Sequence, residues 1–225
     1  MQVYSSEDEQ VEAIKRWFRE YGRQILTGVL VAAVVAFGIY SWKQRQDYQR
    51  AAASIEYQNL LQAVEQVEAG RTAETLATAR HLADTLKKDF SGSAYAQFAA
   101  LFKARLAVQD GDLAQAETEL RWVLEQKPSD DIRALTTLRL ARVLFAKGDS
   151  AATLALLDDK KAGGYASAFA QLRGDIALAK GETDNARAEY QRAQNLESKM
   201  ATPLNDPVLE MKLRDLQAPK AEGAN

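Results

Sequence analysis

The stretch from Gln24 to Trp42 most constrains this chain, because none of its residues carries a charge. A helix over Ile25 to Trp42 would be roughly 27 Å long, close to the hydrocarbon thickness of a bilayer. Its apolar side chains contribute about −3 to −5 kcal/mol to insertion, and no central Arg or Asp opposes this with a cost of about 2.5–3.5 kcal/mol. We therefore expect residues 24–42 to form a transmembrane helix. Aromatic residues bracket it, as membrane interfaces favour: Trp17, Phe18, Tyr21, Tyr40 and Trp42.

Two alternatives for this stretch are a buried helix of a soluble core and a cleaved signal peptide. The preceding region is long and acidic, unlike a short basic n-region, and Tyr40-Ser41-Trp42 replaces the small residues of a cleavage site. Both alternatives are therefore disfavoured. Charge alone leaves the orientation open, since similar numbers of basic residues flank the span. They are Lys15, Arg16, Arg19 and Arg23 before it, and Lys43, Arg45 and Arg50 after it.

The rest of the chain is long enough for one domain with a core and has the composition of an all-α protein. It is rich in Ala and Leu and has few Gly and Pro residues. A net charge of −2 implies no general attraction to nucleic acid. With no cysteine, disulfides and thiolate chemistry are excluded. The single histidine, His81, lies beside Arg80 in an expected helix and is interpreted as structural.

Residues 1–23 are expected to form an amphipathic segment. Ser6 and Glu9 have the spacing of a capping box that opens a helix. One apolar stripe then runs into the membrane span, and such a stripe either lies among lipid headgroups or docks on another protein. The stripe consists of Val11, Ile14, Phe18, Tyr21 and Ile25.

Within the span, a ridge of small residues offers a candidate contact for another membrane helix. Gly28, Ala32 and Ala36 follow one another at intervals of four residues and so share one helix face. Small side chains let a neighbouring helix approach closely, although alanine is common in such segments anyway.

Residues 43–89 are expected to be membrane-proximal helices. The helical pattern continues through 51–67 and ends near Gly70. A second helix is expected over 73–88, with an interruption at 90–93.

An internal repeat follows, over residues 90–217. A glycine and an acid, at Gly111, Gly148 and Gly181, end one helical run and begin the next, at separations of 37 and 33 residues. A helical hairpin of about 34 residues is the tetratricopeptide period. Glycine ends the first helix in the left-handed conformation, and the acid suits the start of the second. We therefore expect a helical-hairpin solenoid.

The close-packing positions of the repeats support this register. Seven residues before each glycine stand Ala104, Ala141 and Gly174, all small. The middle unit departs from the pattern at Thr153 and Lys160, so its second helix is expected to be short or shifted. Pro128 closes the first unit. After the last repeat, a capping helix is expected to start at Asp206-Pro207 and run to Leu216, and residues 218–225 are expected to form a disordered tail.

Stacked hairpins of this kind form a concave groove lined by the first helix of each pair. Its apolar floor with arginines at one rim would suit an extended peptide or a partner helix. The alternative is that the leucines are core, covered by the helices from Ala51 to Lys88. The candidate partner groove comprises the columns Phe98/Leu135/Ala168, Leu101/Leu138/Gln171 and Arg105/Arg142/Asp175.

Motifs for chemistry are missing from the sequence. It contains no Gly-rich phosphate loop, nucleophile elbow or zinc-protease motif, so we expect neither an enzyme nor a bound cofactor or metal. The Lys/Asn pattern that clamps a C-terminal carboxylate in some repeats of this class is also absent, because Leu101 and Leu138 occupy the expected places.

Three segments carry a family resemblance. The first is E-D-E-Q-V-E-A-I-K-R-W-F-R-E-Y-G before a single span. The others begin at Leu138, with L-R-L-A-R-V-L-F-A-K-G-D, and at Leu172, with L-R-G-D-I-A-L-A-K-G-E. These segments resemble the YfgM-like family of ancillary subunits of the SecYEG translocon, and the similarity covers about residues 7–216.

This resemblance implies an inner-membrane protein with a cytoplasmic N-terminus and a periplasmic repeat domain. It also implies partnership with the SecYEG translocon and with a membrane-anchored periplasmic chaperone of the PpiD type. The favoured hypothesis is a non-enzymatic adaptor that passes translocated proteins to chaperones. The alternatives are a scaffold for another cell-envelope complex and a chaperone that holds unfolded clients by itself.

Overall fold

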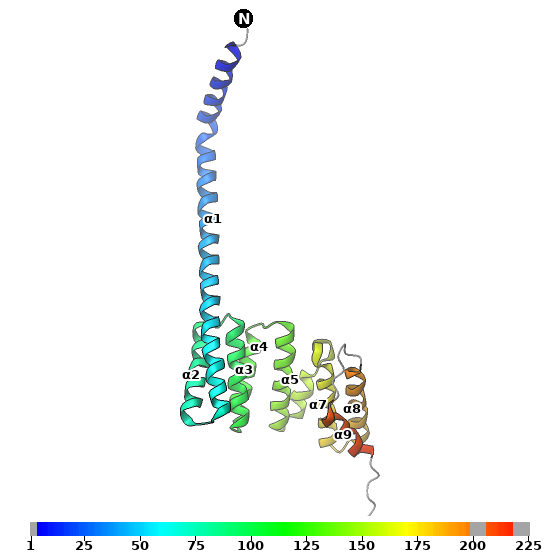
Figure 1. The fold of residues 1–225 in the computed structure, drawn as a ribbon. Helices are drawn as coiled ribbons and strands as arrows, with labels where there is room; N and C mark the ends of the chain where they lie inside the picture. Colours follow the sequence, from blue (N-terminus) through cyan, green and yellow to red (C-terminus); the bar gives the residue numbers. More distant parts are fainter. Residues whose placement is uncertain (1–3, 199–205, 218–225) are drawn as a thin grey trace, which may run out of the picture. The chain divides into compact units, whose positions relative to one another are not determined.

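The computed structural model describes residues 4–198 and 206–217. The described residues form the α-helices α1 to α9 and two 3-10 helices, with no strand among them (Figure 1). The predicted all-α fold class is confirmed. Contacts divide the chain into two units, Met1–Ala52 and Ala53–Asn225, which are called here the N-terminal unit and the repeat unit. The expected tail 218–225 lies outside the described residues.

The N-terminal unit contains the first part of α1, which spans Tyr4–Ala69. The helix is already formed at Tyr4, so the prediction that Ser6 caps its start is wrong. Because the chain is already helical before Ser6, that residue lies within the helix. The capping-box spacing of Ser6 and Glu9 therefore does not fall at the helix N-terminus.

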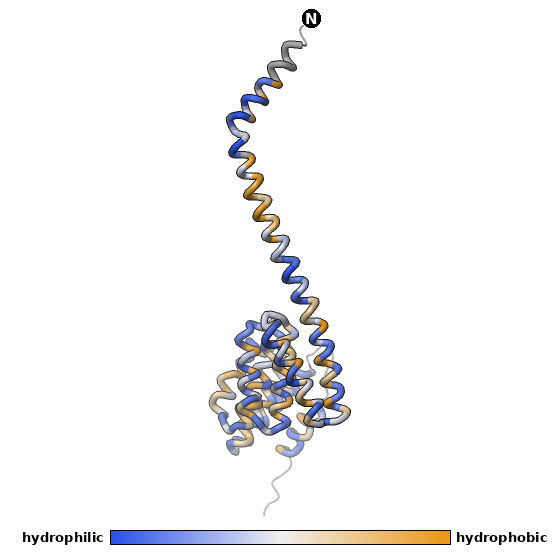
Figure 2. Tube along the Cα trace, turned by 90° about the vertical axis from the view of Figure 1, so that its left-hand side faces the viewer, coloured by the Kyte–Doolittle hydropathy of each residue, from blue (hydrophilic) through white to orange (hydrophobic). Residues whose placement is uncertain are grey.

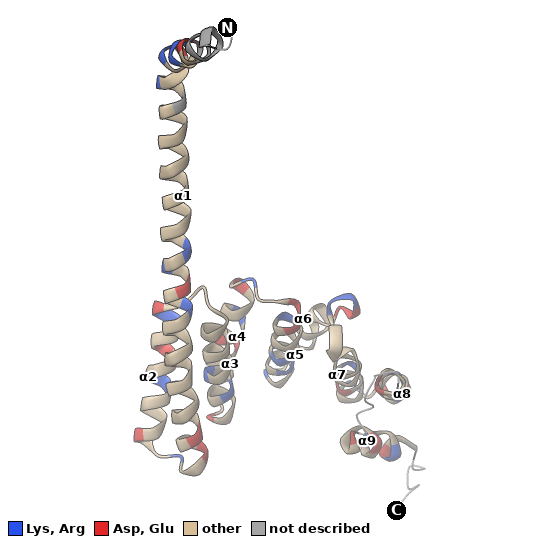
Figure 3. Cartoon of the chain, turned by 45° about the horizontal axis from the view of Figure 1, so that its top comes forward, with Lys and Arg blue, Asp and Glu red and all other residues tan. Residues whose placement is uncertain are grey.

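An uncharged band of α1 carries the apolar residues of the expected span (Figures 2 and 3). Its side chains are exposed; Phe37, for example, is 73% exposed and Val34 is 66% exposed. Among the described residues, the segment Leu26–Ala69 is the one that is long and apolar enough to cross a membrane. An exposed apolar surface of this length is unfavourable in water and favourable in a bilayer.

The repeat unit is a succession of antiparallel helical hairpins, as Figure 1 shows. Residues 53–69 of α1 pair with α2, and each later pair repeats the arrangement. The helices are α2 (Ala73–Asp89), α3 (Ala94–Gln109), α4 (Leu113–Glu125), α5 (Asp130–Ala146), α6 (Ser150–Leu156), α7 (Ala166–Ala179), α8 (Thr183–Glu197) and α9 (Pro207–Gln217). The helices predicted over 51–67 and 73–88 are therefore present, and the break at 90–93 separates α2 from α3.

The three glycine turns have the predicted left-handed conformation, with φ values of 76° at Gly111, 86° at Gly148 and 78° at Gly181. In each turn the N–H of the following acid donates to a carbonyl five residues earlier, at 2.9–3.0 Å. This is the Schellman arrangement, in which a residue with positive φ closes the helix. Asp112 then caps α4 by accepting from the Gln115 N–H at 2.9 Å. Asp149 caps α6 in the same way by accepting from the Ala152 N–H at 2.9 Å, whereas the Glu182 side chain makes no capping hydrogen bond to α8. The glycines thus end all three helices as predicted, and the acid caps the next helix in the first two turns.

The middle hairpin has the short second helix that the sequence predicts. α6 is seven residues long and is followed by the 3-10 helices Asp159–Lys161 and Gly163–Tyr165. Thr153 is fully buried, and its hydroxyl donates to the Asp149 carbonyl at 2.7 Å. Beyond α6, the Arg173 guanidinium of α7 donates to the Leu157 carbonyl at 3.0 Å. That bond satisfies a carbonyl which a longer helix would have used itself.

Close packing within the last hairpin depends on Gly174. A Cβ at this position would overlap the ring of Tyr190, which is fully buried between α7 and α8. The Tyr190 hydroxyl donates to Asp175 Oδ1 at 2.7 Å. Burial, then the hydrogen bond to Asp175, and then the negative charge of Asp175 raise the pKa of the Tyr190 phenol. The small residue predicted at the crossing of α7 and α8 is therefore required, because a larger one would overlap the Tyr190 ring.

A buried carboxylate joins three helices of the first hairpins. Glu119 of α4 is 2% exposed and pairs with Lys87 of α2 at 2.5 Å and with Lys103 of α3 at 2.7 Å. Burial lowers the pKa of Lys103, but hydrogen bonds and charge from Asp84 and Glu119 outweigh this, and the pKa lies above its ordinary value. Removing one member of such a buried group leaves an unpaired charge and is costly.

The C-terminal helix α9 begins as expected, with Pro207 at its first position and Asp206 before it. The Asp206 carboxylate accepts from the Val208 N–H at 2.9 Å. Leu209 and Leu213 are buried against α7 and α8. α9 therefore covers the end of the stack.

Candidate functional site

An apolar cavity of about 340 Å³ lies between α3 and α5, over α4. Leu101, Arg105 and Val108 reach it from one face of α3, because residues four and then three apart share a helix face. α5 presents Arg139, Arg142, Val143 and Ala146 at the corresponding spacing, and α4 presents Leu113 and Leu120. Ala104 and Gln109 of α3 complete the lining. The hairpin fold thus brings apolar side chains and three arginines to one place.

The floor of the cavity is part of the hydrophobic core. Leu101 is 5% exposed, Leu120 is 1% exposed and Val143 is 5% exposed, and all three belong to one cluster of buried residues. Val108, by contrast, is 46% exposed at the edge. A rigid apolar floor with an accessible edge can accept an apolar side chain of a partner without rearranging.

The arginines surround this floor. Arg105 pairs with Glu68 at 3.0 Å, and its guanidinium lies 5.3 Å from the centre of the Phe102 ring. Desolvation lowers the pKa of Arg139, and the positive charges of Arg105 and Arg142 lower it further. The cavity edge therefore carries a concentration of positive charge.

The cavity includes three residues of the predicted partner groove, Leu101, Arg105 and Arg142. Two others, Leu135 and Leu138, pack against hydrophobic clusters instead. Leu138 is 4% exposed within the cluster that contains Phe169 of α7, and Leu135 is half-buried against the cluster of α3, α4 and α5. The alternative that the leucines are core thus describes Leu138, but its covering helix is α7 rather than the helices from Ala51 to Lys88.

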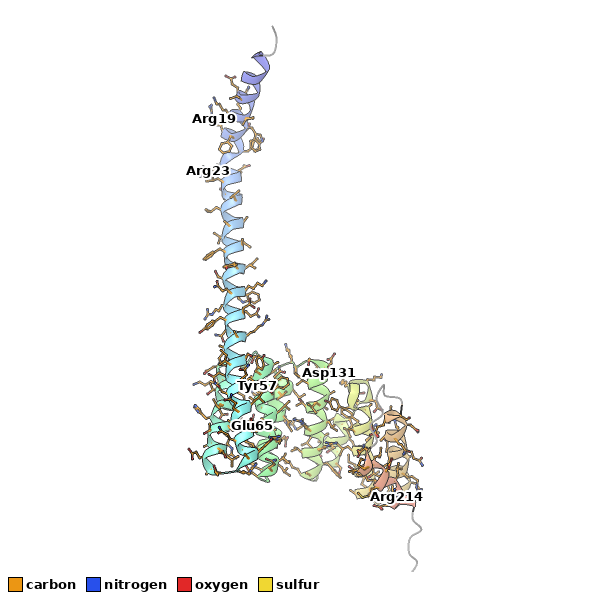
Figure 4. All side chains as sticks on the ribbon, viewed as in Figure 1. Arg19, Arg23, Tyr57, Glu65, Asp131 and Arg214 are labelled. Atoms are coloured by element: carbon orange, nitrogen blue, oxygen red, sulfur yellow. The ribbon has the colours of Figure 1, made fainter. Side chains whose placement is uncertain are left out.

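Phe98 and Asp175, also expected to face the groove, make other contacts. The Phe98 ring lies 5.8 Å from that of Tyr57 on α1, a residue labelled in Figure 4. Asp175 accepts from Lys212 of α9 at 2.6 Å as well as from Tyr190. Neither residue lines the cavity between α3 and α5.

The small-residue ridge of the span lies in the N-terminal unit, where the other described residues of the span are exposed as well. Gly28, Ala32 and Ala36 are all exposed on α1. An added Cβ at Gly28 would meet nothing within 4 Å. Exposure therefore does not distinguish the ridge from the other faces of the span, and the helix contact stays a prediction.

Comparison with known proteins places these features in a family. The profile of the tetratricopeptide repeat-like domain matches residues 15–218. The ancillary SecYEG translocon subunit of Escherichia coli (strain K12) is 30% identical over 216 residues, which are 96% of this chain and 99% of the relative. That of Aggregatibacter actinomycetemcomitans is 32% identical over 95% of this chain and 100% of its own length. The chain belongs to the family of ancillary SecYEG translocon subunits.

A further ancillary subunit, from Haemophilus influenzae (strain ATCC 51907 / DSM 11121 / KW20 / Rd), is 30% identical over 95% of this chain and 100% of its own length. No solved structure matches the chain. The resemblance to the translocon subunits and the tetratricopeptide-like fold expected from the sequence are thus confirmed.

Sequence reasoning missed several cavity residues of this family member, chiefly Arg139, Val108 and Leu113. The sequence could have indicated Arg139 as a groove residue, because it lies three residues before Arg142 and hence on the same helix face. The predicted columns followed single repeat positions, whereas a cavity between helices is lined by two neighbouring positions on each.

Proposed function

We propose that this chain is a non-enzymatic, membrane-anchored adaptor of the Sec translocon. Residues 24–42 anchor it in the inner membrane, with residues 1–23 in the cytoplasm. Residues 43–89 connect the span to the repeats over 90–217, and this whole portion lies in the periplasm. The observation that carries the proposal is the similarity to ancillary SecYEG translocon subunits over nearly the full chain, span and repeats together.

The adaptor holds partner proteins at the translocon exit and helps pass translocated chains to periplasmic chaperones. The resemblance to YfgM-like proteins extends the partner set to a membrane-anchored chaperone of the PpiD type. Anchoring raises the effective concentration of the repeat unit at the translocon, so each individual contact can be weak. The cavity between α3 and α5 and the ridge of Gly28, Ala32 and Ala36 are the proposed contact surfaces.

Purification of the tagged full-length chain from membranes in mild detergent, followed by mass spectrometry, tests this function. The proposal predicts that the SecYEG subunits and a PpiD-type chaperone are recovered in excess over an unrelated tagged single-span protein. Recovery of cell-wall or cytochrome assembly enzymes without the translocon would support a scaffold for another envelope complex and contradict the proposal.

A further inference from the structure

The cavity between α3 and α5 combines an apolar interior with unneutralised positive charge. In the described part of the chain, no carboxylate oxygen lies within 4.0 Å of the Arg139 or Arg142 guanidinium. Both side chains are exposed, and no acid lines the cavity. The chain as a whole has a net charge of −2, so this local excess of arginine is a property of the surface rather than of the composition.

Most other arginines in the described part of the repeat unit are matched with acids, and Arg214 of α9 is an exception. Arg173 pairs with Asp159 and Glu189 at 2.9 and 3.0 Å, and Arg121 pairs with Glu117 at 2.7 Å. Arginines that lack such partners and stand beside an apolar floor are suited to carboxylates from another molecule, because a guanidinium binds a carboxylate through two parallel hydrogen bonds.

We propose that this cavity binds a segment of a separate protein that carries carboxylates directly beside a large apolar side chain. The apolar side chain enters between Leu101, Leu120 and Val143, and the carboxylates meet Arg139 and Arg142. This inference rests on the proposed function for the location of the partner protein, but not for the chemistry of the bound segment. A volume of about 340 Å³ is at the small end for a ligand site, which suits an anchoring side chain of a polypeptide.

Three labelled peptides of equal length separate the two parts of this recognition. In the first, leucine alternates with glutamate; in the second, leucine alternates with lysine; in the third, serine alternates with glutamate. Fluorescence anisotropy with the full-length chain in detergent micelles should show binding of the first peptide only, weakening as salt is added. Equal binding of the lysine peptide or of the serine peptide would overturn the proposal.

Charge reversal assigns the binding to the cavity. The double variant Arg139→Glu/Arg142→Glu should bind the acidic leucine peptide at least about tenfold more weakly and should gain affinity for the lysine peptide. Arg214→Glu on α9, an exposed arginine outside the cavity that is labelled in Figure 4, is the matched control and should bind as the unaltered chain does. A circular dichroism spectrum equal to that of the unaltered chain shows that the double variant is folded.

Each remaining outcome decides the question. Unchanged binding of the acidic leucine peptide by the double variant would refute the site. Loss of the bound peptide when phosphatidylglycerol vesicles are added, or when copies of the chain associate with one another, would refute it as well. If peptide binding depends on the arginines but the translocon is not recovered in the purification described above, the proposed function fails and the inference stands. If the translocon is recovered but peptide binding does not depend on the arginines, the inference fails and the proposed function stands.

Discussion

Gly174 shows how a single residue type is fixed by its neighbour. A methyl group there would overlap the Tyr190 ring, which is held by its hydrogen bond to Asp175 and cannot move away freely. Overpacking of this kind costs roughly 1–3 kcal/mol. We predict that Gly174→Ala lowers the free energy of unfolding by about that amount, measured by denaturation followed by circular dichroism.

A double variant and a control make the Gly174 prediction specific. Gly164→Ala, where an added Cβ would meet nothing within 4 Å, should have little effect. Tyr190→Leu removes the ring, so Gly174→Ala should cost less in that background than in the unaltered chain. An equal cost in both backgrounds would show that the ring is not what excludes the methyl group.

Asp159 links the short middle hairpin to the last one, and its role predicts a pH dependence. Desolvation acts to raise its pKa, but hydrogen bonds from Arg192 and Arg173 outweigh this and hold the pKa below its ordinary value of 3.8. Because the folded-state pKa is the lower one, the stabilisation is complete above the unfolded-state pKa and is lost as pH falls through the folded-state value.

We predict that Asp159→Asn lowers the melting temperature at neutral pH by a few degrees, since exposed ion pairs contribute about 0.2–1 kcal/mol each. The difference from the unaltered chain should begin to shrink as the pH falls below 3.8 and should vanish only below the lower, folded-state pKa of Asp159. Asp184→Asn, which breaks one exposed pair with Arg187, is the control for removing a surface carboxylate. A difference that persists unchanged in acid would mean that the Asp159 charge is not the cause.

Among the elements, α1 carries the ridge of Gly28, Ala32 and Ala36, which is the proposed contact for another membrane helix. The double variant Gly28→Leu/Ala32→Leu stays apolar and should insert normally, yet it should recover severalfold less translocon in detergent purification. Val34→Leu, on another face of the same span, is the matched control and should leave recovery unchanged. Equal recovery with all three chains would exclude the ridge as a contact.

The sequence predicted those elements whose cause is local. Gly111, Gly148 and Gly181 end helices through their own backbone conformation. A small residue is needed at Gly174 because the Tyr190 ring, in the next helix of the same hairpin, occupies the adjacent space. The candidate site was predicted only in part. Which of Leu101, Leu135 and Leu138 remain accessible depends on how consecutive hairpins stack, and a short α6 lets α7 cover Leu138.

Contacts made by distant elements account for the other differences. Phe98 meets Tyr57, which lies 41 residues earlier in the chain (98 − 57), and Asp175 meets Lys212 of α9. The glycine–acid repeat of the sequence encodes neither contact, because its first turn is at Gly111 and its last at Gly181, so that it includes neither α1 nor α9. The start of α1 at Tyr4 is likewise earlier than its capping signal.

At the scale of the whole molecule, the proposed topology can be tested cleanly because the chain has no cysteine. Single variants Ser6→Cys and Thr118→Cys place one thiol on either side of the span. With a membrane-impermeant maleimide applied to spheroplasts, Thr118→Cys should be labelled and Ser6→Cys should be labelled only after lysis. Labelling of Ser6→Cys in intact spheroplasts, with Thr118→Cys protected, would require the opposite orientation.

The proposed contact of the repeat unit with the Sec machinery is the cavity between α3 and α5. Its most direct test is photocrosslinking in living cells from position 142 at the cavity edge, compared with position 118 on the exposed face of α4. We predict that position 142 gives discrete adducts containing a translocon subunit or its chaperone and that position 118 gives none. Indiscriminate labelling of unrelated envelope proteins from position 142, or translocon adducts from position 118 alone, would contradict the claim.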